Sequence, residues 1–212
     1  MIKNIIFDFD GVIIDSMHIR SFGFNEIFKE YDQSSVKSLL KYHNDNGGLS
    51  RFVKIKYFFN TLLNQEISEQ EISSYAQQYS KIMRKKLISR DIIITETLDF
   101  IKSNYSTYKM HIASGSEHNE LNYLNESLSL NSYFLSINGS PTPKKEIVRA
   151  ILKDNFYKSN ETLLIGDSIN DYDAAIENDI IFIGYNNQSL KDISEYYIDN
   201  YEKFQIDFLK VR

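Results

Sequence analysis

The chain has no cysteine and only two prolines among its 212 residues. Without cysteine it can form neither a disulfide nor a zinc–thiolate site, and it has no thiol nucleophile. No apolar run approaches the ~20 residues that a membrane-spanning helix requires. The apolar N-terminal segment contains Asp8 and Asp10, which the hydrophobic region of a signal peptide would not tolerate. We therefore expect a soluble, cytoplasmic protein with no membrane partner.

Positive charge is also in short supply, since 24 Lys and Arg stand against 29 Asp and Glu and give a formal net charge of -5. A nucleic-acid-binding protein needs a basic footprint, so this balance argues against a nucleic-acid partner. The remaining composition is that of an ordinary globular protein, 42% hydrophobic and 25% charged. A chain of this length fits one domain with a small insert.

Short apolar runs typical of buried strands recur along the chain, and helical patterns separate most of them. This alternation predicts an α/β fold built on a doubly wound, Rossmann-like parallel sheet with helices on both faces. The predicted strands are 2–9, 108–113, 133–137, 162–165 and 180–183, and the helices between them are 97–104, 117–126, 144–153 and 171–178.

The stretch that follows the first strand has no strand pattern and contains only amphipathic helical segments. Ser68 and Glu71 are spaced as a capping box at the start of the last segment. The predicted helices of this stretch are 17–31, 34–42, 50–63 and 68–87.

A helical stretch inserted after the first strand of a parallel sheet predicts a small separate domain. We expect a helical cap domain over residues 16–89, inserted into an α/β core formed by 1–15 and 90–212. The hinges between the two would lie near 15–17 and 89–92.

Polar residues follow the predicted strands, at the edge where an open parallel sheet binds its ligands. Asp8 and Asp10 end the first strand and share a face, because they are two residues apart. Neighbouring carboxylates raise each other's pKa unless a cation lies between them, and a divalent metal would supply that cation for phosphoryl chemistry. The later strand ends carry Ser114-Gly115-Ser116, Pro141-Thr142-Pro143-Lys144 and Gly166-Asp167-Ser168-Ile169-Asn170-Asp171.

In this order the four motifs resemble those of the haloacid dehalogenase superfamily. The resemblance is to its phosphatase branch with a helical cap, the branch of β-phosphoglucomutase and phosphoglycolate phosphatase, and it spans essentially the whole chain. It implies an enzyme with a cap inserted between the first and second motifs. The matching residues are Asp8-Phe9-Asp10, Ser114, Lys144, and Asp167 with Asp171 after Gly166.

The resemblance implies roles in phosphoryl transfer for five residues. Asp8 would attack phosphorus and form an aspartyl-phosphate. Asp10 would protonate the leaving oxygen and then deprotonate the water that clears the intermediate. Ser114 and the amide of Gly115, at the start of a helix, would cradle the phosphoryl group, and Lys144 would add a positive charge beside it.

The resemblance also implies a Mg2+ site. Asp8, the backbone carbonyl of Asp10 and Asp167 would hold the ion, whose octahedral geometry suits a few carboxylates with waters and a phosphate oxygen. Asp171 would either ligate the ion directly or orient a metal-bound water.

Segment 46–51 is the most distinctive part of the predicted cap. A similar turn in β-phosphoglucomutase carries an arginine that contacts the distal phosphate of the substrate, which suggests that Arg51 recognises an anionic or polyol part of the substrate. An exposed arginine at a helix start is an equally good interpretation. Lys54, further along the same helix, could join Arg51, and Lys145 is the alternative to Lys144 in the third motif.

The four histidines give weaker signals. We expect His18 and His43 of the cap to be solvated or packed, and His111, inside a predicted strand, to be structural. His118 opens the helix after Ser114. His118 or Asn119 could line the pocket there, but we expect both to lie outside it.

A proton donor at Asp10 favours phosphate esters, whose leaving alkoxide needs a proton. We expect a Mg2+-dependent phosphatase that acts on a small phosphorylated metabolite, with a sugar phosphate first among the candidates. A phosphomutase of the β-phosphoglucomutase type would use the same residues and is the alternative, and a catalytically inactive binding protein is a third hypothesis. The expected partner is a small phosphate ester, and the expected state is a monomer or weak dimer.

Overall fold

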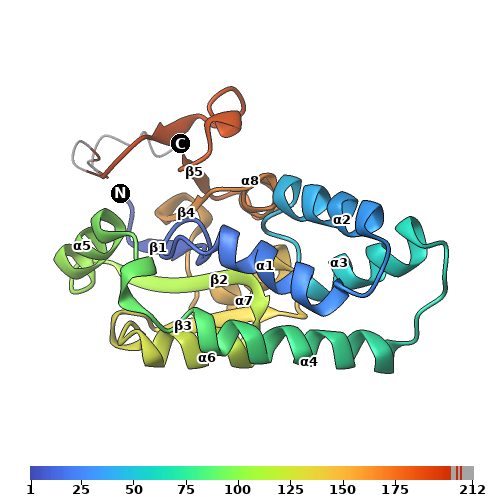
Figure 1. Ribbon diagram of the computed structural model, residues 1–212. Helices are drawn as coiled ribbons and strands as arrows, with labels where there is room; N and C mark the ends of the chain where they lie inside the picture. Colours follow the sequence, from blue (N-terminus) through green and yellow to red (C-terminus); the bar gives the residue numbers. More distant parts are fainter. Residues whose placement is uncertain (202–203, 205, 207–212) are drawn as a thin grey trace.

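The computed structural model describes residues 1–201, 204 and 206, and its strands form one parallel sheet with the order β3-β2-β1-β4-β5-β6 (Figure 1). β1 lies between β2 and β4, so the carboxyl ends of these three strands meet at one edge of the sheet. The strands are β1 (Asn4–Phe7), β2 (Lys109–Glu117), β3 (Ser136–Ser140), β4 (Thr162–Gly166), β5 (Ile181–Tyr185) and β6 (Tyr196–Ile198).

Helices cover both faces of the sheet, which confirms the doubly wound, Rossmann-like fold class. Ile5 and Phe7 of β1 belong to a core cluster with residues of α5 and α6, whereas Ile6 belongs to a second cluster with residues of α7 and α8. Successive side chains of a strand point to opposite faces, so β1 is buried on both. These helices are α5 (Thr95–Asn104), α6 (His118–Ser127), α7 (Lys144–Asp154) and α8 (Ile169–Glu177).

The chain between β1 and α5 forms helices that pack at one side of the sheet (Figure 1). The predicted capping box is present: the Ser68 amide donates to Glu71 Oε2 at 2.9 Å, and the Glu71 amide donates to Ser68 Oγ at 3.3 Å. Stacked rings of Phe28 and Phe58, with centroids 4.2 Å apart, help to fill the space between the helices. The helices are α1 (Met17–Phe28), α2 (Gln33–Asp45), α3 (Arg51–Tyr57) with a π-helical turn (Phe58–Leu62), and α4 (Glu69–Lys86).

Two segments join this insert to the rest of the chain, and they run side by side. Asp15 N donates to Ile92 O at 2.7 Å, and Ile94 N donates to Ile13 O at 2.9 Å. An antiparallel bridge between Ile14 and Ile93 lies between these bonds. The two segments that connect the insert to the sheet therefore lie next to each other, shortly after the end of β1.

Two strand predictions differ from the structure. β2 continues to Glu117 through a register shift against β3 that begins at Ala113, so it is longer than 108–113. The apolar run 133–137 does not form the next strand: Phe134 packs edge-to-face on Phe7 at 6.1 Å, and the half-buried edge strand β3 begins at Ser136. Only the last two residues of the predicted run, Ser136 and Ile137, belong to β3, which continues through polar residues and glycine to Ser140.

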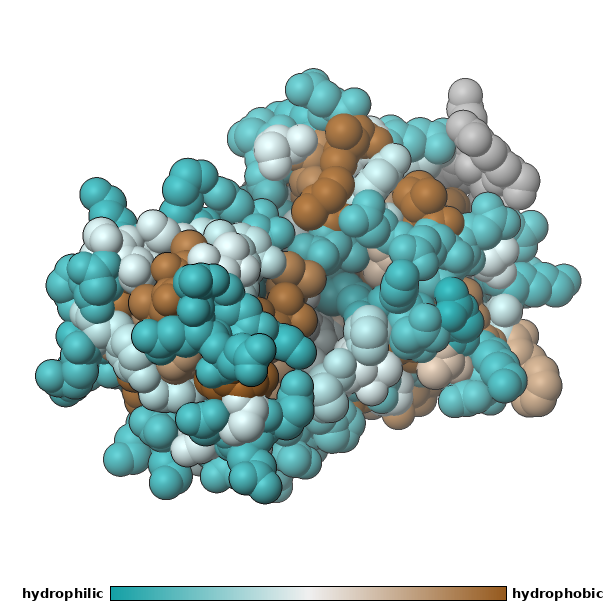
Figure 2. All heavy atoms as spheres, turned by 90° about the vertical axis from the view of Figure 1, so that its right-hand side faces the viewer, coloured by the Kyte–Doolittle hydropathy of each residue, from teal (hydrophilic) through white to brown (hydrophobic). Residues whose placement is uncertain are grey.

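β6 was not among the predicted strands. Part of the predicted core segment 90–212 lies outside the described residues, at 202–203, 205 and 207–212. Within the described part of the chain, no helix is long and apolar enough to cross a membrane. Viewed from the right-hand side of Figure 1, the surface is mostly hydrophilic, and hydrophobic residues form separate patches on it (Figure 2).

Candidate active site

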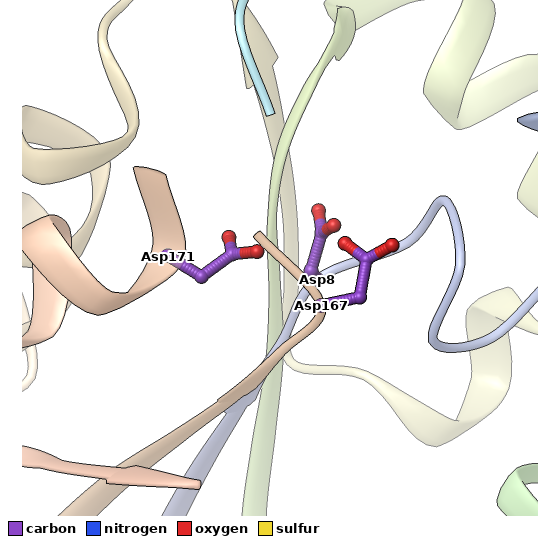
Figure 3. A group of neighbouring side chains, drawn as sticks. All are labelled: Asp8, Asp167 and Asp171. Carbon is purple, nitrogen blue, oxygen red and sulfur yellow. The ribbon is translucent and has the colours of Figure 1, made fainter. Parts of the chain in front are cut away.

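Three carboxylates meet at the carboxyl edge of the sheet. Asp8 directly follows β1, Asp167 directly follows β4, and Asp171 lies in the first turn of α8. One oxygen of each lies within 4.8 Å of the others, and Figure 3 shows Asp8 and Asp167 side by side with the Asp171 carboxylate extending toward them. β1 and β4 are hydrogen-bonded neighbours, which is why residues about 160 positions apart form one cluster.

Lys144, the first residue of α7, reaches into this cluster. Its Nζ lies 2.8 Å from Asp8 Oδ1 and also pairs with Asp171 Oδ1. The other oxygen of Asp171 accepts from the amide and hydroxyl of Ser168, at 3.0 and 2.7 Å, and so caps α8. Lys145 is exposed and pairs with Glu177 at 3.2 Å. Of the two lysines considered for this position, the structure therefore places Lys144 beside Asp8.

The cluster has three carboxylates and one lysine, and this excess of negative charge raises the pKa values of two of the carboxyl groups. Burial and Asp171 raise the pKa of Asp8, while Lys144 partly offsets them. Burial and Asp8 likewise raise the pKa of Asp167. The pKa of Lys144 is raised by Asp171 and Asp8 in spite of its burial. A compact set of carboxylate oxygens, two of the three groups buried and Asp167 half-buried, fits Mg2+, which prefers oxygen ligands.

Gly11 makes room for Asp167. Its φ of +80° lies in the left-handed region that favours glycine, and a Cβ there would stand 2.0 Å from Asp167 Oδ2. The Asp167 carboxylate thus packs against the backbone of the turn that follows Asp10. A side chain at position 11 would push it out of the cluster.

The carboxylate of Asp10 has different partners from that of Asp8. It accepts from Arg20 Nε at 2.9 Å, from Ser116 Oγ at 2.6 Å and from the hydroxyl of Ser16. Burial alone would raise the pKa of Asp10, but Arg20 and the two hydroxyls outweigh it and lower that pKa. The expectation that Asp8 and Asp10 raise each other's pKa is therefore wrong for Asp10, because the sequence did not reveal Arg20 as its partner.

A buried ion-pair network extends from Asp10 into the insert. Glu120 Oε1 accepts from Arg20 at 2.7 Å and from Arg51 at 2.7 Å, and its Oε2 accepts from Arg51 at 2.6 Å. The Arg51 guanidinium also lies over the ring of Tyr79, 4.6 Å from its centroid. Arg51 is thus not the exposed arginine that one interpretation expected, since it is 4% exposed. No local pattern marks Arg20 or Glu120, which lie 100 positions apart.

A cavity of about 30 Å³ lies between the insert and the sheet edge. The insert and the sheet edge approach closely beside it: a Cβ at Gly115, on the sheet side, would stand 2.3 Å from the carbonyl oxygen of Gly48 in the insert. Ser114 lies in the cavity wall and its Oγ accepts from the Ser116 amide at 3.1 Å. The cavity is lined by Asp8, Asp10, Met17, Arg20, Phe24, His43, Gly47, Gly48, Leu49, Arg51, Lys54, Tyr79, Ser114, Gly115 and Ser116.

Ser114 and Gly115 do not start a helix, as the sequence suggested. They belong to the irregular end of β2, and α6 begins only at His118. The backbone stays extended there because β2 keeps pairing with β3 beyond its register shift. Both residues still reach the cavity.

Two of the four histidines, His43 and His111, are buried, and the other two are exposed. His111 bonds Ser136 Oγ at 2.8 Å and the Tyr157 hydroxyl at 3.1 Å, and burial lowers its pKa to about 4. His18 and His118 are exposed, and neither lines the cavity. His43 is buried in the cavity wall beside Lys54, a contact that the sequence did not reveal.

The site is an acidic, lysine-containing cluster at the carboxyl edge of an open parallel sheet, the edge where such sheets bind their ligands, and a helical insert covers it. The family profile described as haloacid dehalogenase-like hydrolase matches residues 5–185. The chain belongs to this family, which confirms the resemblance read from the four motifs and the assignment as a hydrolase.

Solved structures agree on the fold. A β-phosphoglucomutase from Clostridium difficile superposes with a TM-score of 0.78 at 20% identity, covering 98% of this chain and 95% of that chain. CbbY from Rhodobacter sphaeroides, in complex with xylulose-(1,5)bisphosphate, gives 0.75 at 16% identity, covering 96% of each chain. A protein described as a predicted phosphoglycolate phosphatase from Haemophilus somnus gives 0.73 at 15% identity, covering 94% and 95%. No curated protein sequence matches significantly.

Proposed function

We propose that the protein is a Mg2+-dependent phosphatase that hydrolyses a small phosphorylated metabolite, with a sugar phosphate as the first candidate, through an aspartyl-phosphate on Asp8. The observation that carries this proposal is the position of Lys144, whose Nζ lies 2.8 Å from Asp8 Oδ1 within the cluster of Asp8, Asp167 and Asp171. A carboxylate nucleophile beside a fixed cation at a ligand-binding sheet edge suits attack on a phosphate ester.

Each residue of the centre has a defined role in this proposal. Asp8 attacks phosphorus and displaces the alcohol, while Lys144 stabilises negative charge on the phosphoryl oxygens. Ser114 and the Gly115 amide bind the same oxygens from the end of β2. Mg2+, held by Asp8, Asp167 and the carbonyl of Asp10 with Asp171 beside them, would neutralise charge on the phosphoryl group.

Asp10 is the proposed acid–base. It gives a proton to the leaving alkoxide, then takes one from the water that attacks the aspartyl-phosphate, which releases phosphate and restores Asp8. Ser16, Arg20 and Ser116 fix its carboxylate between the insert and the sheet. The insert, residues 16–89, serves as a cap that excludes bulk water in this proposal.

A sugar phosphomutase is the second candidate. The likeness to β-phosphoglucomutase supports it, and so does the tight contact between Gly48 and Gly115, which leaves little room for water in the cavity. In a mutase, a sugar hydroxyl takes the place of water as the acceptor of the phosphoryl group from Asp8.

The test is phosphate release from a panel of sugar phosphates and short phosphate esters, with Mg2+ and with a chelator. Asp8→Asn controls for the nucleophile, because it keeps the size of the side chain and removes its charge. Lys144→Met and Lys145→Met form a matched pair of adjacent lysines, one in the cluster and one exposed. We expect a loss of about 10²–10³-fold for Lys144→Met and wild-type rates for Lys145→Met.

Release that is abolished by Asp8→Asn and by the chelator supports the phosphatase. Isomerised sugar phosphate, followed by phosphorus NMR in the same reactions, would instead support the mutase. A folded, Mg2+-supplied protein that does neither contradicts both proposals, and equal losses for the two lysine variants contradict the role of Lys144.

A further inference from the structure

Three cationic side chains line the cavity, and two of them have acidic partners there. Arg20 pairs with Asp10 and Glu120, and Arg51 pairs with both oxygens of Glu120. Lys54 is the third, and it forms no ion pair with any carboxylate in the described part of the chain. Among the described residues, the cavity therefore contains one cation, Lys54, that no carboxylate pairs with.

The surroundings of Lys54 use only part of its bonding capacity. Its side chain, on α3, is 2% exposed. The Nζ lies 2.9 Å from His43 Nδ1 and 3.1 Å from the carbonyl oxygen of Gly47. An ammonium group has three donors, so one remains after these two contacts. His43 cannot balance the charge, because burial and the nearby Lys54 lower its pKa to about 2 and keep it neutral.

A buried charge without a partner costs free energy, which shows in the titration of the group. Burial lowers the pKa of Lys54 to about 7, with Arg20 and Arg51 adding to the effect and Asp10 and Asp167 opposing it. An anion that enters the cavity would relieve this cost. Arg51 has no comparable need, since Glu120 already binds it through two hydrogen bonds.

We propose that Lys54, and not Arg51, binds an anionic group of the substrate that is remote from the transferred phosphoryl group: a carboxylate or a second phosphate. The proposal rests on the proposed function, because the substrate is a phosphate ester held at Asp8. It narrows the substrate class to phosphate esters with a second negative charge. The cavity of about 30 Å³ holds little more than water, so the insert must move outward to admit such a molecule.

A purely structural role for Lys54 makes a different prediction. Its bond to Gly47 O fixes the loop that carries Gly48 against Gly115. If that were its only role, removing the amine would weaken every substrate alike. A variant without the Lys54 amine therefore distinguishes the two roles. If Lys54 binds an anion, the variant loses the preference for the more anionic of two substrates, and if Lys54 is only structural, the variant keeps that preference.

The first experiment uses two such pairs of substrates. They are 2-phosphoglycolate against 2-hydroxyethyl phosphate, and xylulose 1,5-bisphosphate against xylulose 5-phosphate. The values of kcat/KM are measured for the wild type, for Lys54→Met and for Lys56→Met, an exposed lysine on the same helix. We expect the wild type to prefer the more anionic member of at least one pair by about tenfold or more, mainly through KM. Lys54→Met should lose at least about tenfold of this preference, and Lys56→Met should keep it.

The second experiment does not need turnover. Isothermal titration calorimetry of 2-phosphoglycolate and 2-hydroxyethyl phosphate, with Asp8→Asn and with Asp8→Asn/Lys54→Met, measures the same preference as a ratio of Kd values, and thermal unfolding checks that both variants fold. No preference in the wild type, an equal preference with and without Lys54, or no binding of either ligand overturns the proposal. Absence of phosphate release with an intact binding preference would overturn the proposed function alone.

Discussion

Arg20 and Asp10 form a buried ion pair, with Arg20 Nε 2.9 Å from Asp10 Oδ1. Arg20 lies on α1, in the insert, whereas Asp10 follows β1. The proposed acid–base is therefore held by a residue of the element that covers it. Because Arg20 stabilises the ionised carboxylate, it favours the form of Asp10 that can accept a proton from water.

Removing Arg20 should change the pH dependence of the reaction. In Arg20→Met, Asp10 stays buried but loses its cation, so its pKa rises. With saturating Mg2+, which requires Asp8 to be ionised, the acidic limb of the kcat profile reports the loss of ionised Asp10 and should move to higher pH by at least about one unit. Arg149→Met, at an exposed arginine paired with Glu146, is the control and should leave the limb in place. An unmoved limb in Arg20→Met would contradict the role of the pair.

Glu120 should matter for stability more than any surface acid. It is fully buried between two guanidinium groups, and Glu120→Ala would leave both without this partner. We expect the free energy of unfolding, measured in urea, to fall by about 3–5 kcal/mol. The half-exposed Glu146, which binds Arg149 at 2.7 Å, supplies the control, and Glu146→Ala should cost about 0–1 kcal/mol. Similar losses of unfolding free energy in the two variants would show that the buried network contributes no more to stability than an exposed ion pair does.

The contact between Gly48 and Gly115 should be needed for activity. A Cβ in Gly115→Ala would meet the Gly48 carbonyl oxygen at 2.3 Å and hold the insert away from the sheet. A misplacement of about 1 Å at a catalytic centre costs about 100-fold in rate, so we expect kcat/KM of Gly115→Ala to fall by about that factor. Gly47→Ala is the matched control, because the nearest atom, Met17 Cε, would be 3.9 Å from the new Cβ. Full activity in Gly115→Ala would mean that catalysis does not need the closed contact.

Mg2+ should stabilise the protein more at high pH than at low pH. Burial and Asp171 raise the pKa of Asp8 from 3.8 to about 7 in the folded state. The folded protein then keeps a proton that the unfolded chain loses, so without metal its stability falls as pH rises from about 4 to about 7. Mg2+ needs ionised ligands, and its binding adds to stability.

Thermal unfolding with and without Mg2+ tests this expectation. The rise in Tm on adding Mg2+ should be larger at pH 8 than at pH 5, and it should be lost in Asp167→Asn. Asp173→Asn, at an exposed position on α8, should keep it. A rise that is independent of pH, or that survives Asp167→Asn, would argue against binding at the carboxylate cluster.

The order of strands and helices could be predicted from the sequence because it depends on local patterns. Apolar runs of strand length, separated by helical periodicity, predicted the parallel sheet and a helical insert over residues 16–89. The four motifs at strand ends predicted which residues approach one another, since parallel strands bring their carboxyl ends to one edge. Asp8, Asp167 and Asp171 meet there as that rule requires.

Only the tertiary structure decided how the charges are paired. Glu120 lies 100 positions from Arg20 and 69 from Arg51, and no spacing in the sequence records contacts that packing of the insert on the sheet creates. The same packing placed Asp10 with Arg20 and selected Lys144 over Lys145. It also left Lys54 without an acidic partner among the residues that the structure describes. The sequence by itself determined which groups stand at the edge of the sheet, because that follows from local periodicity. Which of them are neutralised and which remain free was decided by long-range packing, because electrostatic pairing depends on distance in space.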